Sequence, residues 1–259
     1  MTSELDQRPP DLWSRLRIHT QARIGLQRSG SSLATAEMLS FQLAHARARD
    51  AVHVGLDADQ LMTAMVARSW ATVCLHSAAP DRRTYLLRPD LGRKLNPSAR
   101  AKIETSATGY DLAIVVADGL SAVAVQRHAI PLLDLAIPRL QQLSWRIGPV
   151  AIVAQGRVAI GDEIGALLSA QMVVVLIGER PGLSAPDSLG AYVTWAPAVG
   201  RSDAERNCIS NIRPEGLGIA DAAAKLIHLV SEARRRGLTG VMLKDESETV
   251  KLVKNDRAP

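Results

Sequence analysis

Aromatic side chains are scarce in this chain. Its 259 residues include four Trp, three Tyr and a single Phe, Phe41. A core of ordinary size must therefore be built from Leu, Ile, Val and Ala. Such a composition suits parallel strands covered by helices better than an aromatic-rich antiparallel barrel. The length is sufficient for one large domain or two modest ones.

Cysteine is nearly absent as well. The two residues, Cys74 and Cys208, are too few for a disulfide framework or a paired-cysteine metal site. The first ten residues are polar and contain no apolar stretch, so we expect no secretory signal. No apolar run approaches the length of a membrane span. We therefore expect a cytoplasmic protein that has no membrane partner.

The common catalytic and phosphate-binding motifs are missing too. The chain has no G-x-x-x-x-G-K-[ST] loop and no G-x-G-x-x-G after a predicted strand. It also lacks the H-E-x-x-H pattern of zinc sites and the G-x-S-x-G nucleophile elbow. The six histidines are scattered along the sequence. We therefore expect no catalytic residue and no metal ligand in this chain.

A basic patch of the kind that binds nucleic acid is also lacking. The net charge is +5, and basic residues are spread along the chain without interleaved aromatics. The one dense run, Arg234–Arg236, ends a predicted helix just before Gly237. Cations there meet the negative end of the helix dipole, so a capping role explains them without a polyanion. We expect no nucleic-acid partner.

What the chain does contain is a set of three similar junctions, each a short apolar run that stops at glycine and polar residues. The runs are Leu112–Ala117, Pro149–Ala154 and Met172–Ile177. Runs without polar alternation indicate strands buried on both faces, hence a parallel sheet covered by helices. Ligands of such sheets lie outside the carboxyl ends of the strands. The clusters at 118–121, 155–158 and 178–182 therefore predict one ligand crevice.

The predicted elements change character near residue 107, from helical to alternating strand and helix. We predict an α/β protein in which an N-terminal helical region precedes a Rossmann-like, mainly parallel sheet flanked by helices. The expected parts are a flexible N-terminus (1–10), a helical domain (11–107), an α/β domain (108–245) and a charged tail (246–259).

The helical region predicts an amphipathic helix that Thr35 caps and that carries Leu39 and Leu43 on its apolar side. Further helices are expected over Asp57–Trp70 and after Asn96-Pro97. The segment Tyr85–Arg93 has the pattern of a strand end and a loop.

In the α/β region, the segment from about Ser121 to Gln142 contains Pro131 and Pro138. These prolines predict two helices or one kinked helix. The further predicted elements are a helix over Gly161–Ala170, a short strand over Tyr192–Trp195, a strong helix over Ile219–Arg236 and a last strand over Gly240–Leu243.

Six segments share their sequence, order and spacing with one known family. They are Leu43–Val52, Arg88–Arg93, Asp118–Ser121, Gly156–Val158, Gly178–Leu183 and Cys208–Ile212. Together they resemble the small (light) subunit of ethanolamine ammonia-lyase, an adenosylcobalamin-dependent enzyme. The similarity runs from about Asp11 to Leu243.

The resemblance implies a subunit of a carbon–nitrogen lyase that converts ethanolamine to acetaldehyde and ammonia by a radical mechanism. In that family the large subunit is a TIM barrel that holds ethanolamine and the catalytic residues, and the small subunit completes the cobalamin site. The family's cofactor-contact positions fall on Val158, Glu179 and Cys208. Two of them, Val158 and Glu179, also lie in the junctions that the strand pattern identifies.

Each of these residues has a role that its chemistry suits. The Glu179 carboxylate would accept hydrogen bonds from amide groups around the corrin ring. Val158 would offer backbone groups and an apolar contact to the cofactor's nucleotide tail. Cys208, expected in a loop, would contact the cofactor without ligating cobalt. The alternatives are a surface pair of Glu179 with Arg180 or a capping role for Glu179, a core role for Val158 and a plain buried thiol for Cys208.

Asp118 and Arg157 belong to the same predicted edge. We expect them to form a salt bridge with each other or with the partner, and we do not place them in the site.

Two other functions fit the same sequence. A stand-alone nucleotide-binding Rossmann-like enzyme would use the predicted sheet, although its glycine fingerprint is missing, and would bind NAD or ATP by itself. A non-catalytic interaction protein would carry a vestigial crevice and would retain no cobalamin even beside the large subunit. Some relatives have a longer N-terminal extension that is nearly missing here, which leaves packaging in a bacterial microcompartment open.

Overall fold

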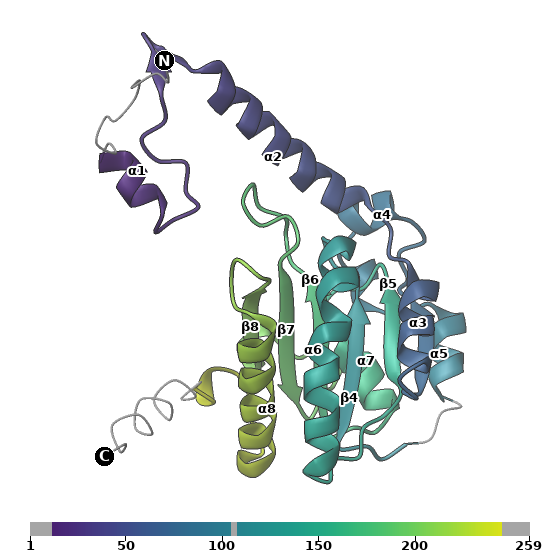
Figure 1. The fold of residues 1–259 in the computed structure, drawn as a ribbon. Helices are drawn as coiled ribbons and strands as arrows, with labels where there is room; N and C mark the ends of the chain where they lie inside the picture. Colours follow the sequence, from purple (N-terminus) through teal and green to yellow (C-terminus); the bar gives the residue numbers. More distant parts are fainter. Residues whose placement is uncertain (1–11, 105–107, 245–259) are drawn as a thin grey trace, which may run out of the picture.

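The fold centres on one six-stranded sheet with helices on both faces (Figure 1). It is taken from a computed structural model that describes residues 12–104 and 108–244. In spatial order the strands are β3 (Thr72–His76), β5 (Val150–Ala154), β4 (Leu112–Ala117), β6 (Met172–Gly178), β7 (Leu189–Trp195) and β8 (Arg206–Ile212). The first four are parallel, whereas β7 runs antiparallel to both β6 and β8. The predicted α/β class with a mainly parallel sheet is confirmed.

The three predicted apolar runs form the centre of this sheet as β4, β5 and β6. All six residues of β4 are buried. Its side chains alternate between the faces of the sheet: Leu112, Ile114 and Val116 join one apolar cluster, while the alanines and Val115 join the other. A strand with both faces covered by helices has no polar face, which explains why polar and apolar residues do not alternate in its sequence.

Helices α3 (Ala58–Val66), α6 (Ala122–Gln142) and α8 (Ile219–Arg236) cover one face. The other face carries α5 (Pro97–Glu104) and α7 (Ile160–Leu167). The predicted helix ends are explained by side-chain caps: Asp57 accepts a hydrogen bond from the Gln60 backbone N–H, and Asn96 accepts one from Ala99.

One continuous helix, α6, spans the segment with two prolines. It begins at Ser121, whose hydroxyl accepts a hydrogen bond from the Ala124 backbone N–H. Pro131 and Pro138 both lie inside it. More than half of the helix is buried against the sheet and α8, and this packing offsets the backbone donors that the prolines remove.

Two predicted elements are wrong. The segment Tyr85–Arg93, expected as a strand end and a loop, forms the end of α4 (Arg82–Leu87) and a 3-10 turn over Leu91–Arg93. Asp81 caps α4 by accepting a hydrogen bond from the Thr84 N–H. The segment Gly240–Leu243, expected as a strand, instead contains a 3-10 turn over Gly240–Met242. Gly240 has a φ of +82°, which an extended strand does not allow.

The structure also contains a strand that the sequence analysis missed. The residues around Cys208, expected as a loop, form β8 at the edge of the sheet. Its burial alternates irregularly, so it lacks the continuous apolar run that marks the central strands. The predicted short strand at Tyr192–Trp195 is confirmed and begins earlier, at Leu189.

The sheet takes its other edge strand, β3, from the N-terminal side of residue 108. The division of the chain into domains at that point stays a prediction. The predicted flexible N-terminus and charged tail lie outside the described residues. None of the described helices has the length and apolar character needed to cross a membrane.

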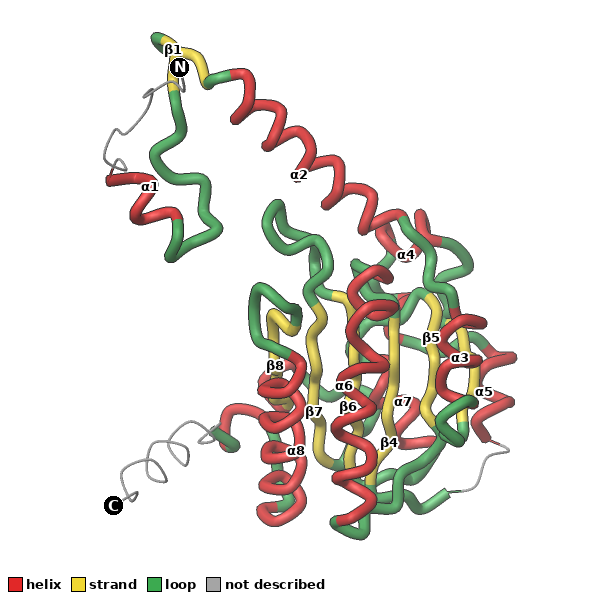
Figure 2. Tube along the Cα trace, viewed as in Figure 1, coloured by secondary structure: helices red, strands yellow, loops and turns green. Residues whose placement is uncertain are grey.

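A long helix, α2 (Thr35–His53), projects from the body, as Figure 2 shows. At its far end lie α1 (Leu12–Arg17) and a hairpin of β1 (Arg28–Ser29) and β2 (Ser32–Leu33). The predicted cap is wrong: Thr35 is the first helical residue, and Ala34 precedes it without a side-chain cap. The predicted apolar side is not buried either, since Leu39 and Leu43 are 56% and 53% exposed.

Candidate functional site

The three junctions of the sequence meet around one cavity of about 400 Å³ at the carboxyl ends of β4, β5 and β6. We call this edge of the sheet the carboxyl rim. The cavity is lined by residues 119–120 after β4, 157–158 after β5 and 177–180 at the end of β6, together with Tyr85 and Tyr192. From β4 the chain passes through α6 to β5 on one side of β4, and from β5 it crosses through α7 to β6 on the other side. The cavity therefore lies where the strand order reverses.

Two glycines let the strand ends approach each other here. Gly119 has a left-handed φ of +56°, and a Cβ on it would lie 2.2 Å from the Gly178 carbonyl oxygen. A Cβ on Gly178 would lie 2.0 Å from the Ser121 carbonyl oxygen. The Leu120 N–H donates to the Gly178 carbonyl at 2.9 Å and closes this contact. Any side chain at either position would push the first and third junctions apart.

Glu179 lies in the lining and ties three strands together. Its Oε1 accepts a hydrogen bond from the Ser210 hydroxyl at 2.6 Å, and its Oε2 accepts from the Ser188 hydroxyl at 2.5 Å. Oε2 also accepts from the Asn211 backbone N–H at 3.2 Å. A carboxylate offers about four lone-pair positions, and the described residues fill three of them, which leaves one position on Oε1. The alternative, a surface pair with Arg180, is not among the contacts that Glu179 makes in the described part of the chain.

Val158 lies in the turn between β5 and α7, beside the cavity. It is half-buried and packs against the apolar cluster that contains α7. The structure therefore gives this residue a partial core role and a place in the lining at once.

Cys208 lies next to the cavity and not in its lining. It stands on β8 directly opposite Tyr192, which does line the cavity. The residue is exposed, so the alternative of a plain buried thiol is wrong. Desolvation by the surrounding protein nevertheless raises the pKa of the thiol, with the Glu179 carboxylate adding to the effect. Its sulfur is therefore a neutral thiol at ordinary pH.

The expected ion pair between Asp118 and Arg157 does not form. Asp118 is buried, and its two carboxylate oxygens accept hydrogen bonds from the Gln155 and Gly156 backbone N–H groups at 2.9 and 3.0 Å. Its cationic neighbour is Arg82, with Nη1 3.6 Å from Oδ2. Burial raises the pKa of Asp118, and the backbone donors and Arg82 oppose that rise. Asp118 thus holds the first two junctions together.

Tyr85 and Arg157 form a further part of the lining. The sequence analysis missed Tyr85 and left Arg157 out of the site. The Tyr85 ring is fully buried, and its hydroxyl donates to the Gly156 carbonyl at 3.1 Å. The guanidinium carbon of Arg157 lies 4.2 Å from the ring centroid, which is a stacked cation–π contact. The sequence offered only a weak signal for Tyr85. It is one of three tyrosines in the chain, and it lies three residues before the Arg88–Arg93 segment.

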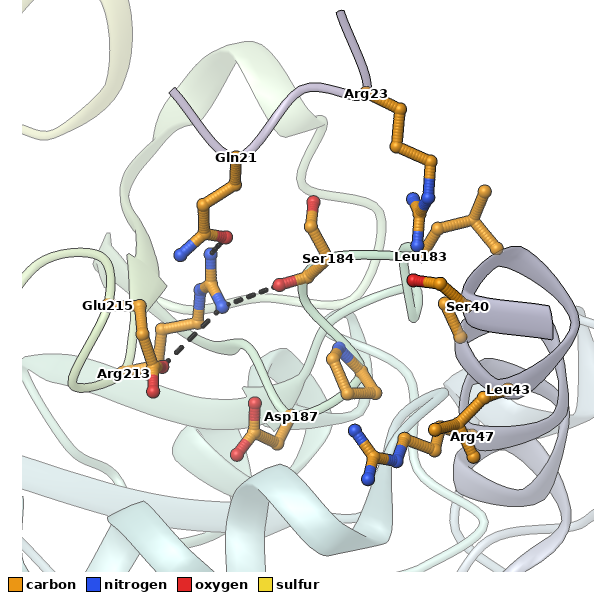
Figure 3. Close-up of a pocket in the computed structure, with 12 residues that line it drawn as sticks. Gln21, Arg23, Ser40, Leu43, Arg47, Leu183, Ser184, Asp187, Arg213 and Glu215 are labelled. Atoms are coloured by element: carbon orange, nitrogen blue, oxygen red, sulfur yellow. Dashed lines mark hydrogen bonds and ion pairs between the residues drawn. The ribbon is translucent and has the colours of Figure 1, made fainter. Parts of the chain in front are cut away.

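A second cavity, of about 430 Å³, lies between α2 and the body (Figure 3). Arg213 stands at its edge and links the N-terminal segment to the sheet. Its Nη2 donates to the Gln21 side chain at 3.0 Å, and its Nη1 donates to the Ser184 carbonyl at 2.8 Å. No predicted site residue lies in this cavity. Over residues 12–104 and 108–244, no group of three or more His, Cys, Asp or Glu could hold a metal ion.

Comparison with known proteins connects this geometry to a family. Residues 10–244 match the family described as ethanolamine ammonia-lyase light chain (EutC). The chain belongs to the ethanolamine ammonia-lyase light-chain family. A protein of Azotobacter vinelandii named ethanolamine ammonia-lyase small subunit is 57% identical over 244 residues, which cover 93% of this chain and 90% of that protein.

Two further relatives carry the same name. The protein of Xanthomonas campestris pv. campestris strain B100 is 57% identical over 93% of this chain and 90% of its own length. The protein of Ralstonia nicotianae is 54% identical over 96% of this chain and 95% of its own length. The resemblance found in the sequence is thereby confirmed. A chain of this light-chain family is a subunit of a lyase, and its catalytic role lies in a complex with a larger partner.

Proposed function

We propose that this chain completes the adenosylcobalamin site of an ethanolamine ammonia-lyase whose large subunit carries ethanolamine and the catalytic residues. The observation that supports this is the meeting of three strand junctions around one cavity that contains no catalytic pair. A cavity of about 400 Å³ is too small to enclose a corrinoid, so it would hold a part of the cofactor while another polypeptide holds the rest.

The residues of the cavity suit a corrinoid. The rim of a corrin ring carries neutral amide side chains, which are recognised by hydrogen-bond acceptors and donors. Glu179 has one open acceptor position, and Val158 offers backbone groups and an apolar surface in the same lining. Cys208 would contact the cofactor from the neighbouring edge strand without binding cobalt. When bound, adenosylcobalamin supplies the radical chemistry that converts ethanolamine to acetaldehyde and ammonia.

The role of this chain is then to position the cofactor and to exclude water. The hydrogen bonds of Glu179 hold the ends of β7 and β8 against the end of β6, so the lining is rigid before the cofactor arrives. A rigid, dry cover limits side reactions of a radical intermediate. Cytoplasmic location, inside or outside a microcompartment, stays a prediction from the sequence.

Co-expression with a large subunit from the same family tests the proposal. The purified complex should bind adenosylcobalamin, seen as a corrinoid absorption spectrum after gel filtration, and should release acetaldehyde from ethanolamine. The isolated chain should bind neither NAD nor ATP. A complex that forms without retaining corrinoid would contradict the proposal and favour a non-catalytic interaction protein. Tight nucleotide binding by this chain would favour the stand-alone enzyme.

The contact at Glu179 has its own test in the same complex. Glu179→Gln keeps the size of the side chain but weakens it as an acceptor, so we expect adenosylcobalamin affinity to fall about tenfold. Ser210→Ala removes one of the internal hydrogen bonds of Glu179 and leaves its charge, so it serves as the matched control. If both variants weaken binding equally, Glu179 acts only through the strand ends and does not contact the cofactor.

A further inference from the structure

The cavity at the carboxyl rim carries more positive than negative charge. Its charged lining residues are Arg157, Glu179 and Arg180. Glu179 already accepts three hydrogen bonds from neutral groups. Neither Arg157 nor Arg180 has an acidic partner among the described residues, whereas the buried or half-buried Arg82, Arg206 and Arg213 each have one. The lining therefore holds two cations whose charge is not neutralised by residues 12–104 and 108–244.

Arg157 is fixed in place by contacts that leave its charge uncompensated. Its backbone N–H donates to the Gly92 carbonyl at 2.8 Å, and its Nη2 donates to the Tyr85 carbonyl at 3.3 Å. A Cβ on Gly92 would lie 2.8 Å from the Arg157 Cγ, so the glycine makes room for the arginine stem. The Arg157 Nε is buried and has no hydrogen-bond partner in the described part of the chain.

The neighbouring Arg82 shows what a purely structural arginine looks like at this position. It also lies over the Tyr85 ring, with its guanidinium carbon 4.8 Å from the centroid. However, its charge faces the buried Asp118 carboxylate, and it donates to the carbonyls of Val52 and Gly119 at 2.6 and 2.8 Å. Arg157 has no such acid within the part of the chain that the structure describes. A preorganised guanidinium without an acid beside it is typical of a site that takes an anion from a ligand.

We propose that Arg157, assisted by Arg180, binds the phosphodiester in the nucleotide tail of the corrinoid. This inference rests on the proposed function, which supplies the ligand. The side chains around a corrin ring are neutral amides, whereas the nucleotide tail carries a phosphate that a guanidinium recognises. Val158, the residue assigned to the nucleotide tail, follows Arg157 directly in the turn after β5. One turn of chain thus meets both the charged and the apolar parts of the tail.

Two corrinoids that differ in this group provide the test. Adenosylcobinamide keeps the corrin ring and the adenosyl group but lacks the nucleotide tail and its phosphodiester. In the complex with the large subunit, we expect Arg157→Met to raise the dissociation constant for adenosylcobalamin about 10- to 100-fold. The same variant should change the constant for adenosylcobinamide less than about twofold. Both constants come from absorbance titrations and need no turnover.

Two controls separate the anion contact from a folding defect. Arg139→Met, in the last turn of α6 at the opposite end of the sheet, should leave both constants unchanged. In the wild-type complex, inorganic phosphate should compete with adenosylcobalamin more strongly than chloride at equal ionic strength, and should not compete with adenosylcobinamide. The phosphate measurement requires no variant, so it holds even if Arg157→Met folds poorly.

The outcomes distinguish the phosphodiester contact from the proposed cobalamin-binding function on which it rests. Equal weakening of both corrinoids by Arg157→Met, or no competition by phosphate, would overturn the anion contact while leaving the cobalamin site in place. A wild-type complex that binds neither corrinoid would overturn the proposed function and this inference together. Selective loss of adenosylcobalamin affinity, with the cobinamide constant retained, supports the contact.

Discussion

At the scale of single residues, the site depends on glycines that let strand ends touch. Gly119 and Gly178 bring the ends of β4 and β6 so close that a Cβ on either would overlap a backbone carbonyl. Flexible side chains can move away from such a conflict, but backbone cannot. The shape of the cavity is therefore set by these two positions as much as by the residues that line it.

Gly178→Ala should destabilise the chain by about 1–3 kcal/mol, since its Cβ would lie 2.0 Å from the Ser121 carbonyl oxygen and force the junctions apart. Urea unfolding followed by circular dichroism measures the change. Gly55→Ala is the matched control, because a Cβ there would meet nothing within 4 Å. Its effect should stay within about 0.5 kcal/mol. Equal stability of the two variants would mean that the strand ends are not in contact.

His128 on α6 should make stability depend on pH. The residue is buried, and its Nε2 lies 3.6 Å from an oxygen of Asp187, which Arg127 also pairs with at 2.8 Å. Burial lowers the pKa of His128, against the opposing attraction of Asp187. Because the folded state resists protonation, this contribution is fully present above about pH 6.5 and is lost as the pH falls below it.

The free energy of unfolding should therefore decrease between about pH 7 and pH 5.5 in the wild type, and decrease less in His128→Leu. Chemical unfolding at a series of pH values provides the comparison. His45→Leu, on the exposed surface of α2, controls for the loss of a histidine as such. A pH slope that is the same in wild type and His128→Leu would exclude this histidine as its source.

The sequence could predict where the site lies but not how its side chains pair. The apolar runs and their glycine ends place Val158 and Glu179 at one edge of a parallel sheet, and both line the cavity. The partners of Glu179 and Arg157 could not be predicted, because they come from segments 9 to 72 residues away in the chain. The contacts of Glu179 depend on the pairing of β7 with β8, and β8 was expected as a loop. The partner of Arg157, Tyr85, lies in α4, which was expected as a strand end.

At the scale of elements, α2 and α8 show that similar sequence patterns can have different surroundings. The first was predicted as an amphipathic helix and the second as a strong helix. The apolar side of α8 packs on the sheet and on α6, with Leu226 and Val230 in the core. The apolar side chains of α2 are largely exposed, and Ala51 is its one buried residue in the structure as described. Periodicity identifies a helix with an apolar side but does not say what covers that side.

Leu226→Ala and Leu39→Ala should therefore differ sharply in the isolated chain. Leu226 is 2% exposed in the core, so its truncation should cost about 2–5 kcal/mol. Leu39 is 56% exposed on α2, and its truncation should change stability by less than about 0.5 kcal/mol. Urea midpoints measure both. Losses of similar size would show that α2 packs against the body in solution.

The elements that were predicted well are those whose local signals agree. The central strands are uniformly apolar, and α8 ends at Gly237, which takes the left-handed conformation at φ +67° expected of a helix C-terminus. The elements that were missed depend on distant contacts. The edge strand β8 is recognisable only by its pairing with β7, and α4 is a short helix whose Tyr85 is buried under the β5 turn.

At the scale of the whole molecule, the sheet and its covering helices have the cavity at the carboxyl rim. The long helix α2 projects beside that same end of the sheet (Figure 1). Arg82 links the two, since its side chain donates to the Val52 carbonyl near the end of α2 and to the Gly119 carbonyl at the carboxyl rim. The base of α2 is thus fixed to the same strand ends that form the cavity.

The exposed apolar surface of α2 has a consequence for the expression of the protein. Met38, Leu39, Phe41 and Leu43 are all exposed within three turns of α2. A chain that is synthesised without its companion would present these side chains to other newly made polypeptides, and exposed apolar patches promote precipitation. We therefore expect cells to produce the two polypeptides in matched amounts. A recombinant preparation of this chain alone should precipitate as its concentration rises.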